Sequence, residues 1–555
     1  MKEETKSLYI AIILSLAVIL ATNWLFPKKT QTTDNDVVAA EKIEVKTAPA
    51  LEDHNEAAIS VEDALKSDRR VQIANQSVSG SIRLKGARLD ELNLTKYKQT
   101  LNPDSGDVAL LAPAQTQTPY YAEFGWLATD NNLKMPNENT LWTLKGSKLT
   151  PQTPVVLEWN NGQGLKFVRK ISIDNNYMFN IEQIVENNTG RNITVYPYGL
   201  ISRTSPEADR NARVVHEGLA GVLDSTLKEI KLDSLKKSKK EEFTSTGGWV
   251  GFSDHYWLSA LILDNNAQSK VKFAQTADNT YQTDFVGPAI NIANGTVGTY
   301  NSKMFAGAKE IRLLDSYTKQ YNIDKFDLAV DFGWYYFLTK PFFYILDFFY
   351  RIIGNMGWAI LLFAALLRLA MFPIANKSYE SMSKMKKVQP KIQDLQNKYK
   401  DDKMKLQAEM MALYKKEKIN PASGCLPMLI QIPVFFSLYK VLNIAIEIRH
   451  APFIGWIKDL SAPDPLTFSA ITHLPVPGFL DIGVWPVIMG LTMYIQQKLN
   501  PAPTNKDQAR MFALMPLLFM FMLGHFASGL VIYWALSNVL SIIQQKVIMK
   551  KVGVN

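Results

Sequence analysis

Hydrophobic residues are distributed differently along the two halves of this 555-residue chain. Before about residue 324, short apolar stretches alternate with polar residues and with turn-forming Asn, Gly and Asp. After about residue 342, long apolar runs dominate, so the mean hydropathy of -0.07 hides two unlike parts. Either half is long enough to bury a core of its own. The pattern predicts a polar, mostly extended region followed by a membrane-embedded one.

The start of the chain carries a separate apolar run. Residues 8–26 contain no charged side chain, and about 19 helical residues rising 1.5 Å each reach across a hydrocarbon core. The run ends in Asn-Trp-Leu-Phe and not at a small-residue cleavage site, which favours an uncleaved anchor over the alternative of a cleaved signal peptide. We predict a transmembrane signal anchor over residues 1–27 and a flexible linker over 28–60, which is rich in Thr, Asp, Glu, Lys and Ala.

Alternation of apolar and polar positions marks residues 61–323 as a region of strands. Residues 165–173 alternate in this way, and Tyr177, Phe179 and Ile181 repeat the pattern. The triplet at 174–176 between them, Asp-Asn-Asn, is typical of a hairpin turn. Many short strands separated by such turns predict a large β-sandwich.

The second half holds five apolar segments that are candidate membrane helices. Residues 324–350 precede them and predict a helical region at the membrane interface, because Phe326–Leu338 is aromatic and apolar but carries two Asp residues. Several of the segments are short and contain proline, which spanning helices tolerate when neighbours satisfy the backbone. With the anchor, the five give six spans. Within the core region 351–555 they cover about 352–372, 425–442, 484–499, 511–526 and 530–547.

Lysine distribution predicts the orientation of these spans. Residues 376–423 contain twelve Lys against six acids, and Lys also occurs at both ends of the chain. Residues 443–483, which join the second and third core segments, hold only Arg449 and Lys458, offset by acids. The positive-inside rule therefore predicts cytoplasmic termini, a cytoplasmic lysine-rich loop and a β domain in the periplasm. The net charge of +9 gathers beside apolar segments and indicates membrane orientation more than nucleic-acid binding.

The lysine-rich loop at residues 376–420 has a helical pattern. From Met382 to Tyr399 its apolar residues are three or four positions apart, and Leu406, Met410 and Leu413 mark a second helix. Asp401 and Asp402 between them are suited to a turn and helix cap. We expect a helical hairpin that stands off the membrane, with Pro390 kinking its first helix or offsetting where that helix starts.

Arg368 is the residue that points most directly to a function. It lies in an apolar segment, where a charge costs about 2.5–3.5 kcal/mol on insertion scales. The other spans contain no acid to pair with it, because Asp347 lies at the opposite end and Glu447 beyond the third span. The alternative is that Arg368 reaches lipid phosphate from near the end of its helix. An unpaired arginine otherwise predicts a water-filled cavity open to the cytoplasm.

Polar residues on the other spans are candidates for the same cavity. Trp534 and Asn538 are four residues apart, on one face of the last helix. Each polar group taken singly is also explained by an interhelical hydrogen bond. Together with Arg368 they favour a polar groove, with the candidates Gln431, Gln496, Gln497, Ser537 and Asn538.

Long strings of the sequence carry a family resemblance. They include LLRLAMFPIANKSYESMSKMKKVQPKIQDLQNKY, EMMALYKKEKINPASGCLPMLIQIPVFFSLY, SGLVIYWALSNVLSIIQQ and, in the first half, GGWVGFSDHYWLSALIL. These strings resemble the YidC family of membrane protein insertases of Gram-negative bacteria, part of the wider YidC/Oxa/Alb group, over essentially the whole chain. The resemblance implies a mixed fold class: a polytopic α-helical membrane core of five helices plus an N-terminal anchor, with a large periplasmic all-β supersandwich.

The same resemblance implies a function and partners. It implies an inner-membrane insertase and chaperone for nascent membrane proteins, acting alone or with the Sec translocon through a hydrophilic groove open to cytoplasm and lipid. Arg368 occupies the family's groove position, and Tyr533 and Trp534 match a pair of aromatics that face the nascent chain, although the second is often Tyr. Ribosome contact is expected through the cytoplasmic loops and not through the tail, which is short past Val547.

Two other functions are weighed against this one. An anion-binding secondary transporter would use Arg368, but such proteins usually show internal repeats, which are not found here. A membrane-anchored periplasmic carbohydrate-binding protein would use the β domain, where the candidate acid/base groups His216, Glu217, Asp254 and His255 have no catalytic spacing. A single cysteine and scattered histidines predict neither metal nor cofactor, and no P-loop is found, so we expect a protein that is not an enzyme.

Overall fold

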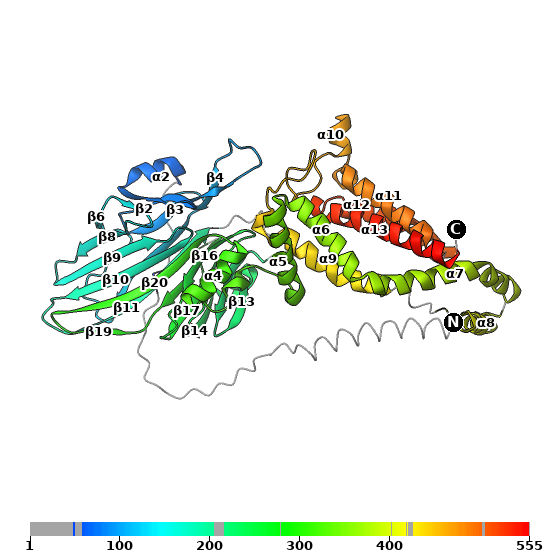
Figure 1. The fold of residues 1–555 in the computed structure, drawn as a ribbon. Coiled ribbons are helices and arrows are strands. Elements are labelled where there is room, and N and C mark those ends of the chain that lie inside the picture. Colours follow the sequence, from blue (N-terminus) through cyan, green and yellow to red (C-terminus); the bar gives the residue numbers. More distant parts are fainter. Residues whose placement is uncertain are drawn as a thin grey trace. The chain divides into compact units, whose positions relative to one another are not determined.

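The computed structural model describes residues 48–49, 58–204, 216–277, 279–400, 402–417, 419, 426–501 and 506–553. The predicted anchor at 1–27, almost all of the predicted linker at 28–60, and Cys425 lie outside these residues. The structure falls into a β part, which holds all the strands, and a helical part, which runs from α5 to α13 (Figure 1).

Two large sheets make up the β part, as the alternating sequence pattern predicts. One has eleven strands in the order β14-β17-β18-β11-β5-β3-β2-β1-β7, with β19 paired to β11 and β4 to β3. Its strands are β1 (Arg70–Ala74), β2 (Val78–Arg83), β3 (Arg88–Lys98), β4 (Asp107–Leu111), β5 (Tyr120–Ala128), β7 (Lys148–Leu149), β11 (Ile193–Thr204), β14 (Lys240–Ser245), β17 (Ser269–Ala277), β18 (Thr280–Val286) and β19 (Ile290–Ile292).

The second sheet has nine strands in the order β13-β12-β15-β16-β20-β10-β9-β8-β6. They are β6 (Thr143–Lys145), β8 (Val155–Asn160), β9 (Leu165–Ile173), β10 (Met178–Asn187), β12 (Gly218–Leu223), β13 (Thr226–Ile230), β15 (Trp249–Ser253), β16 (Trp257–Ile262) and β20 (Thr296–Ala308).

The predicted hairpin at Asp174 is confirmed. β9 and β10 pair antiparallel with Ile173 opposite Phe179. The side chain of Asp174 closes the turn, because its Oδ1 accepts from the backbone N–H groups of Asn176 and Met178. Local turn chemistry therefore fixes the register of this pair, as the sequence indicates.

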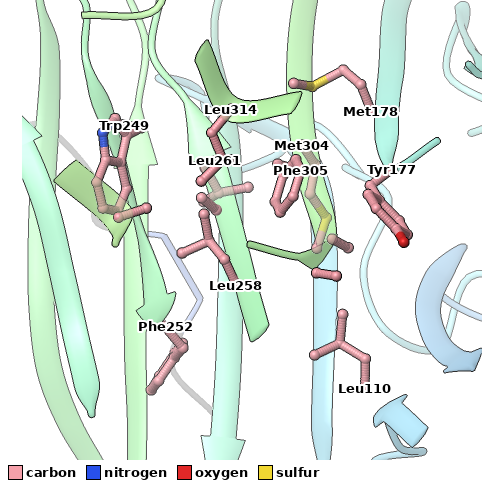
Figure 2. Close-up of a cluster of buried hydrophobic side chains, with 14 of the residues drawn as sticks. Leu110, Tyr177, Met178, Trp249, Phe252, Leu258, Leu261, Met304, Phe305 and Leu314 are labelled. Atoms are coloured by element: carbon pink, nitrogen blue, oxygen red, sulfur yellow. The ribbon is translucent and has the colours of Figure 1, made fainter. Parts of the chain in front are cut away.

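Large apolar side chains fill the core of the β part (Figure 2). Trp249, Leu261 and Phe305 are fully buried. The Phe305 ring makes edge-on contacts with Tyr177, from the turn between β9 and β10, and with Tyr317, from helix α4 (Ile311–Tyr321). Helix α4 thus packs on the strands through an apolar face. The remaining short helices of the β part are α2 (Val61–Ser67) and α3 (Leu232–Ser238).

The helix predicted over Phe326–Leu338 is wrong in its position. Only a 3-10 turn, η2 (Phe326–Ala329), forms there, and α5 begins at Tyr336 and runs to Ile353. Asp331 explains the interruption, since its Oδ1 accepts from the N–H of Gly333, whose φ of 72° is left-handed and breaks a helix. The helix α5 that does form exposes Phe337 and Phe348, as expected of an interfacial helix.

All five predicted core segments are helical. They correspond to α6 (Met356–Ala370), α9 (Leu426–Ile444), α11 (Val484–Leu499), α12 (Lys506–Leu523) and α13 (Ser528–Val552). The first begins later than predicted because Gly354 is left-handed and Asn355 caps α6 by accepting from the N–H of Trp358. Within the described residues, α13 alone is long and apolar enough to span a membrane by itself, and α6 with α7 forms a pair bent by 66°. Shorter elements between α9 and α11 are η4 (Ile446–Ile448), α10 (Phe468–Thr472) and η5 (Gly478–Leu480).

The predicted helical hairpin is confirmed, with a longer first helix. Helix α7 (Phe372–Lys398) starts directly after α6 and contains Pro390 without ending there, and α8 is Lys403–Lys416. Asp402 caps α8 by accepting from the N–H of Lys405. The two helices share a small apolar cluster of Val388, Ile392 and Ile419 with Met385, Met410, Leu413 and Tyr414.

Candidate functional site

Three helices bring polar groups together around Arg368. Arg368 lies in the last turn of α6, and its Nε and Nη2 donate to Ser537 Oγ of α13 at 3.1 and 2.8 Å. One turn earlier on α13, the Tyr533 hydroxyl accepts from Gln431 Nε2 of α9 at 2.9 Å. Ser537 and Tyr533 are buried, so these bonds lie between the helices. The result is a polar row across α6, α13 and α9.

Arg368 has no carboxylate partner among the described residues. Its hydrogen bonds to a neutral hydroxyl leave the guanidinium charge uncompensated, and the side chain is only half-buried. Such a charge requires water or a polar ligand beside it. The expectation of an arginine without an acidic mate, turned towards the other helices, therefore agrees with this geometry.

A cavity of about 370 Å³ lies next to Arg368. This volume holds several water molecules. Among the described residues its wall contains two cations, Arg368 and Lys551, and no carboxylate, together with the amides of Asn376 and Gln544, which are bonded to each other at 2.9 Å. The other lining residues are Ala365, Leu369, Phe372, Leu540, Ile543, Val547 and Ile548. The site is thus a cationic hollow with a largely apolar rim.

Two of the five predicted site residues lie on another face of α13. The Trp534 ring packs against Phe435 of α9 and Phe519 of α12, with ring centres 4.8 and 5.6 Å away. Asn538 Nδ2 donates to Thr492 Oγ1 of α11 at 3.2 Å. The structure therefore brings Arg368, Gln431 and Tyr533 together, and sets Trp534 between α9 and α12 and Asn538 towards α11.

Of the further polar candidates, Ser537 belongs to the row and Gln497 does not. Gln497 Nε2 donates to the backbone of Phe512 in α12. Sequence reasoning missed Gln544 and Lys551 at the cavity. A signal for both exists, because Tyr533, Ser537, Leu540, Gln544, Val547 and Lys551 follow one another at three- or four-residue steps along one helical face.

The candidate acid/base groups of the β part make structural contacts. Arg203 forms an ion pair with Asp254 at 2.5 Å, and His255 Nδ1 lies 3.9 Å from Glu217. The His216 ring contacts the carbonyl of Leu219. Within the described part of the chain, no group of His, Cys, Asp and Glu is arranged to hold a metal ion.

Comparisons with known proteins agree over both halves of the chain. The family model described as the YidC periplasmic domain matches residues 70–345, and the model described as 60Kd inner membrane protein matches residues 348–554. The chain is 45% identical to the membrane protein insertase YidC of Beijerinckia indica, covering 100% of this chain and 97% of that protein. It is 45% identical to the YidC of Rickettsia rickettsii over 99% of this chain and 100% of that protein, and 49% identical to the YidC of Methylobacterium radiotolerans over 89% and 83%.

Among solved structures, one titled as an active YidC insertase with the first transmembrane domain resolved matches 86% of this chain and 92% of that chain. The sequence identity is 19% and the TM-score is 0.38.

Proposed function

Because this chain belongs to the YidC family of membrane protein insertases, and inserts inner-membrane proteins, we propose that the cationic hollow beside Arg368 receives the hydrophilic outer segment of a client. The observation that carries the proposal is the uncompensated Arg368 charge at the end of a cavity of about 370 Å³. The family assignment favours insertion over the transporter and carbohydrate-binding hypotheses.

Electrostatics supports an acidic or strongly polar occupant. Arg368 and Lys551 both line the hollow, and none of the described residues of its wall is a carboxylate. A segment that enters it exchanges bulk water for enclosed water and two positive charges, which lowers the desolvation cost of leaving the cytoplasm. The membrane potential acts on acidic residues of the client in the outward direction.

The apolar part of the client takes a different route in this proposal. Its transfer into lipid provides the main driving force, and no nucleotide is required. Tyr533, bonded to Gln431, borders the polar row, while Trp534, with Phe435 and Phe519, presents an aromatic surface that guides the apolar segment. Asn538, bonded to Thr492, holds α11 against α13 beside that route.

The protein is a multi-pass inner-membrane protein with a periplasmic domain, and its substrates are nascent membrane proteins. In the proposed arrangement residues 1–27 anchor the chain, 28–60 link the anchor to the periplasmic domain at 61–323, residues 324–350 lie at the periplasmic interface, and 351–555 form the insertase core. Both termini and the 376–420 hairpin face the cytoplasm, as the lysine excess there supports. The Sec translocon and the ribosome are the proposed partners, the latter through the cytoplasmic loops.

The test is the charge at position 368. Insertion of a client with an acidic outer segment, measured by protease protection in proteoliposomes, should fall roughly tenfold for Arg368→Ala, equivalent to about 1.4 kcal/mol of lost attraction. Arg368→Lys should keep most of the activity because it keeps the charge. Arg351→Ala is the matched control, since Arg351 is an arginine of α5 that does not line the hollow. Equal insertion by the Ala variant and the wild type would remove the electrostatic step.

A further inference from the structure

The loop between α9 and α11 ends in an exposed apolar surface that the insertion step does not use. Its members, here called the apolar tip, are Phe468, Ile471, Leu474, Phe479 and Leu480. Between 39% and 70% of each of these residues is exposed, although all are large and apolar. From Leu466 to Leu480 the sequence contains no Asp, Glu, Lys or Arg. Exposed apolar surface of this kind marks an interaction site.

Internal hydrogen bonds hold the tip in shape and direct its polar groups inwards. Asp481 accepts from the Thr467 hydroxyl at 2.9 Å and from the Ser469 N–H at 2.9 Å, and the Ser469 hydroxyl also donates to it. Thr467 caps α10, the short helix that carries Phe468 and Ile471. At the base of the tip, the His525 ring contacts the carbonyl of Gly478. Thr467, Ser469 and Asp481 therefore bond to one another, and the loop exposes the apolar tip together with one polar ring, His473.

The tip continues the apolar outer surface of α11. After Asp481, Ile482 and Gly483, α11 begins at Val484 and exposes Val487, Leu491 and Ile495, which are four residues apart. In a multi-pass membrane protein, such a row on the outside of a helix faces lipid. The tip lies at the first turn of that row, and Figure 1 shows α10 projecting away from the other helices there. The tip therefore joins the chain directly before the row that faces lipid.

We propose that the apolar tip inserts into the periplasmic leaflet of the bilayer and anchors the α11–α12 side of the helix bundle to phospholipid acyl chains. The absence of charge fits acyl chains better than a charged partner surface, and Thr467, Ser469 and Asp481 mark its polar base. A second interfacial element lies elsewhere at this end, because α5, with exposed Trp334 just before it and Phe337 within it, packs against α6 and α9. The two anchors hold the core from two sides, and the tip rests about 5–10 Å into the headgroup and acyl boundary.

The chain has a single cysteine, Cys425, so a probe can be placed at one chosen position in a Cys425→Ser background. Full-length protein with Phe479→Cys, labelled with an environment-sensitive nitrobenzoxadiazole dye, is reconstituted into vesicles of phospholipid alone. We expect blue-shifted emission and strong quenching by a lipid that carries a nitroxide at the top of its acyl chain, with weaker quenching by one labelled near the chain end. Adding Leu474→Glu should reduce the quenching at position 479.

Two control positions bracket the result. Leu491→Cys on α11 should be quenched more strongly than any β-part position, whereas Val297→Cys, 58% exposed in β20, should give water-like emission. The proposal is wrong if, in vesicles of phospholipid alone, the dye at position 479 gives the same water-like emission as the dye at position 297. That result would mean that the tip faces water or binds a protein partner. The measurement does not involve client insertion, so its failure is distinguishable from a failure of the Arg368 mechanism.

Discussion

In the β part the large apolar side chains lie between the two sheets or beneath α4 and η2, whereas in the helical part many of them face outwards. Trp249, Leu261 and Phe305 are fully buried (Figure 2), but Leu491 and Leu514 are each about 60% exposed. Polar groups are buried in both regions, and in the helical part α13 buries Ser537, Ser541 and Gln545 between helices. The two regions are folded for different solvents, water around the first and lipid around most of the second.

Buried charges in the two regions differ in the same way. The β part encloses them: Arg88 meets Glu123 at 2.7 Å, and the buried guanidinium of Arg169 donates to the backbone carbonyls of Ala87 and Phe124. The helical part keeps Arg368 next to a hollow, and its one hydrogen-bond partner within the described ranges is the Ser537 hydroxyl. A charge that is fully enclosed cannot meet a ligand, whereas the half-buried charge of Arg368 beside a hollow is available to a visiting counterion. This contrast supports the proposal that the hollow beside Arg368 is the functional site.

The largest expected effect on stability comes from replacing one leucine by alanine in each region. Leu261→Ala in the β core should lower the free energy of unfolding by about 2–5 kcal/mol, because it leaves a cavity between the sheets. Leu514→Ala, on the outside of α12 and 62% exposed, should change it by about 0.5 kcal/mol or less. Thermal unfolding of the purified protein in detergent checks both. Equal losses would show that Leu514 is buried against protein and not lipid.

The second effect lies at the junction between the two parts and depends on pH. Glu447, in η4, accepts from the N–H of Ile311 at the start of α4, at 3.1 Å. Its second oxygen is buried and has no partner within the described part of the chain. Burial, with Glu310 and Asp347 nearby, raises the pKa of Glu447 from its ordinary value of 4.5 to about 7.

The sign of the pH effect follows from proton binding. Between the two pKa values the folded protein keeps the Glu447 proton and the unfolded chain releases it, so stability falls as pH rises, by up to about 3 kcal/mol above pH 7. Glu447→Gln keeps the acceptor for Ile311 and should remove this dependence, making the variant more stable than wild type at pH 8 and similar at pH 4. Unfolding curves at the two pH values measure it. Leu261→Ala is the control, since the stability that it loses should not vary with pH. If the Gln variant keeps the wild-type dependence of stability on pH, Glu447 is not its source.

Features encoded by neighbouring residues were predictable from the sequence, and those that depend on distant contacts were not. The Asp174 turn, the Asp402 cap and the existence of the five core helices follow from local patterns. The face that Trp534 presents does not, because it depends on how α9 and α12 pack around α13. The same holds for Glu447, whose partner Ile311 is 136 residues away.

The candidate site, too, was predictable in part: the charge was visible in the sequence, and its contacts were not. An arginine in an apolar segment, with no acid in the other spans, is visible in the sequence and predicts a polar cavity. Which hydroxyl it contacts is not visible, since Ser537 was one of several polar candidates on α9, α11 and α13. The helix predicted at Phe326–Leu338 is an error of local interpretation. Its prediction rests on apolar and aromatic composition and overlooks the turn that Asp331 and Gly333 form.

The smallest expected effect compares two buried serines. Ser537→Ala removes the hydroxyl that accepts two hydrogen bonds from Arg368, but the adjacent hollow lets water replace it, so the loss of stability should be about 1 kcal/mol. Ser302→Ala in β20 removes a buried hydroxyl that has no hydrogen-bond partner within the described ranges, so it should be neutral or slightly stabilising. Unfolding midpoints measured side by side test the pair. A loss at Ser537 of about 3 kcal/mol or more would mean that no water reaches Arg368, and the hollow would then be too dry to receive a hydrophilic segment.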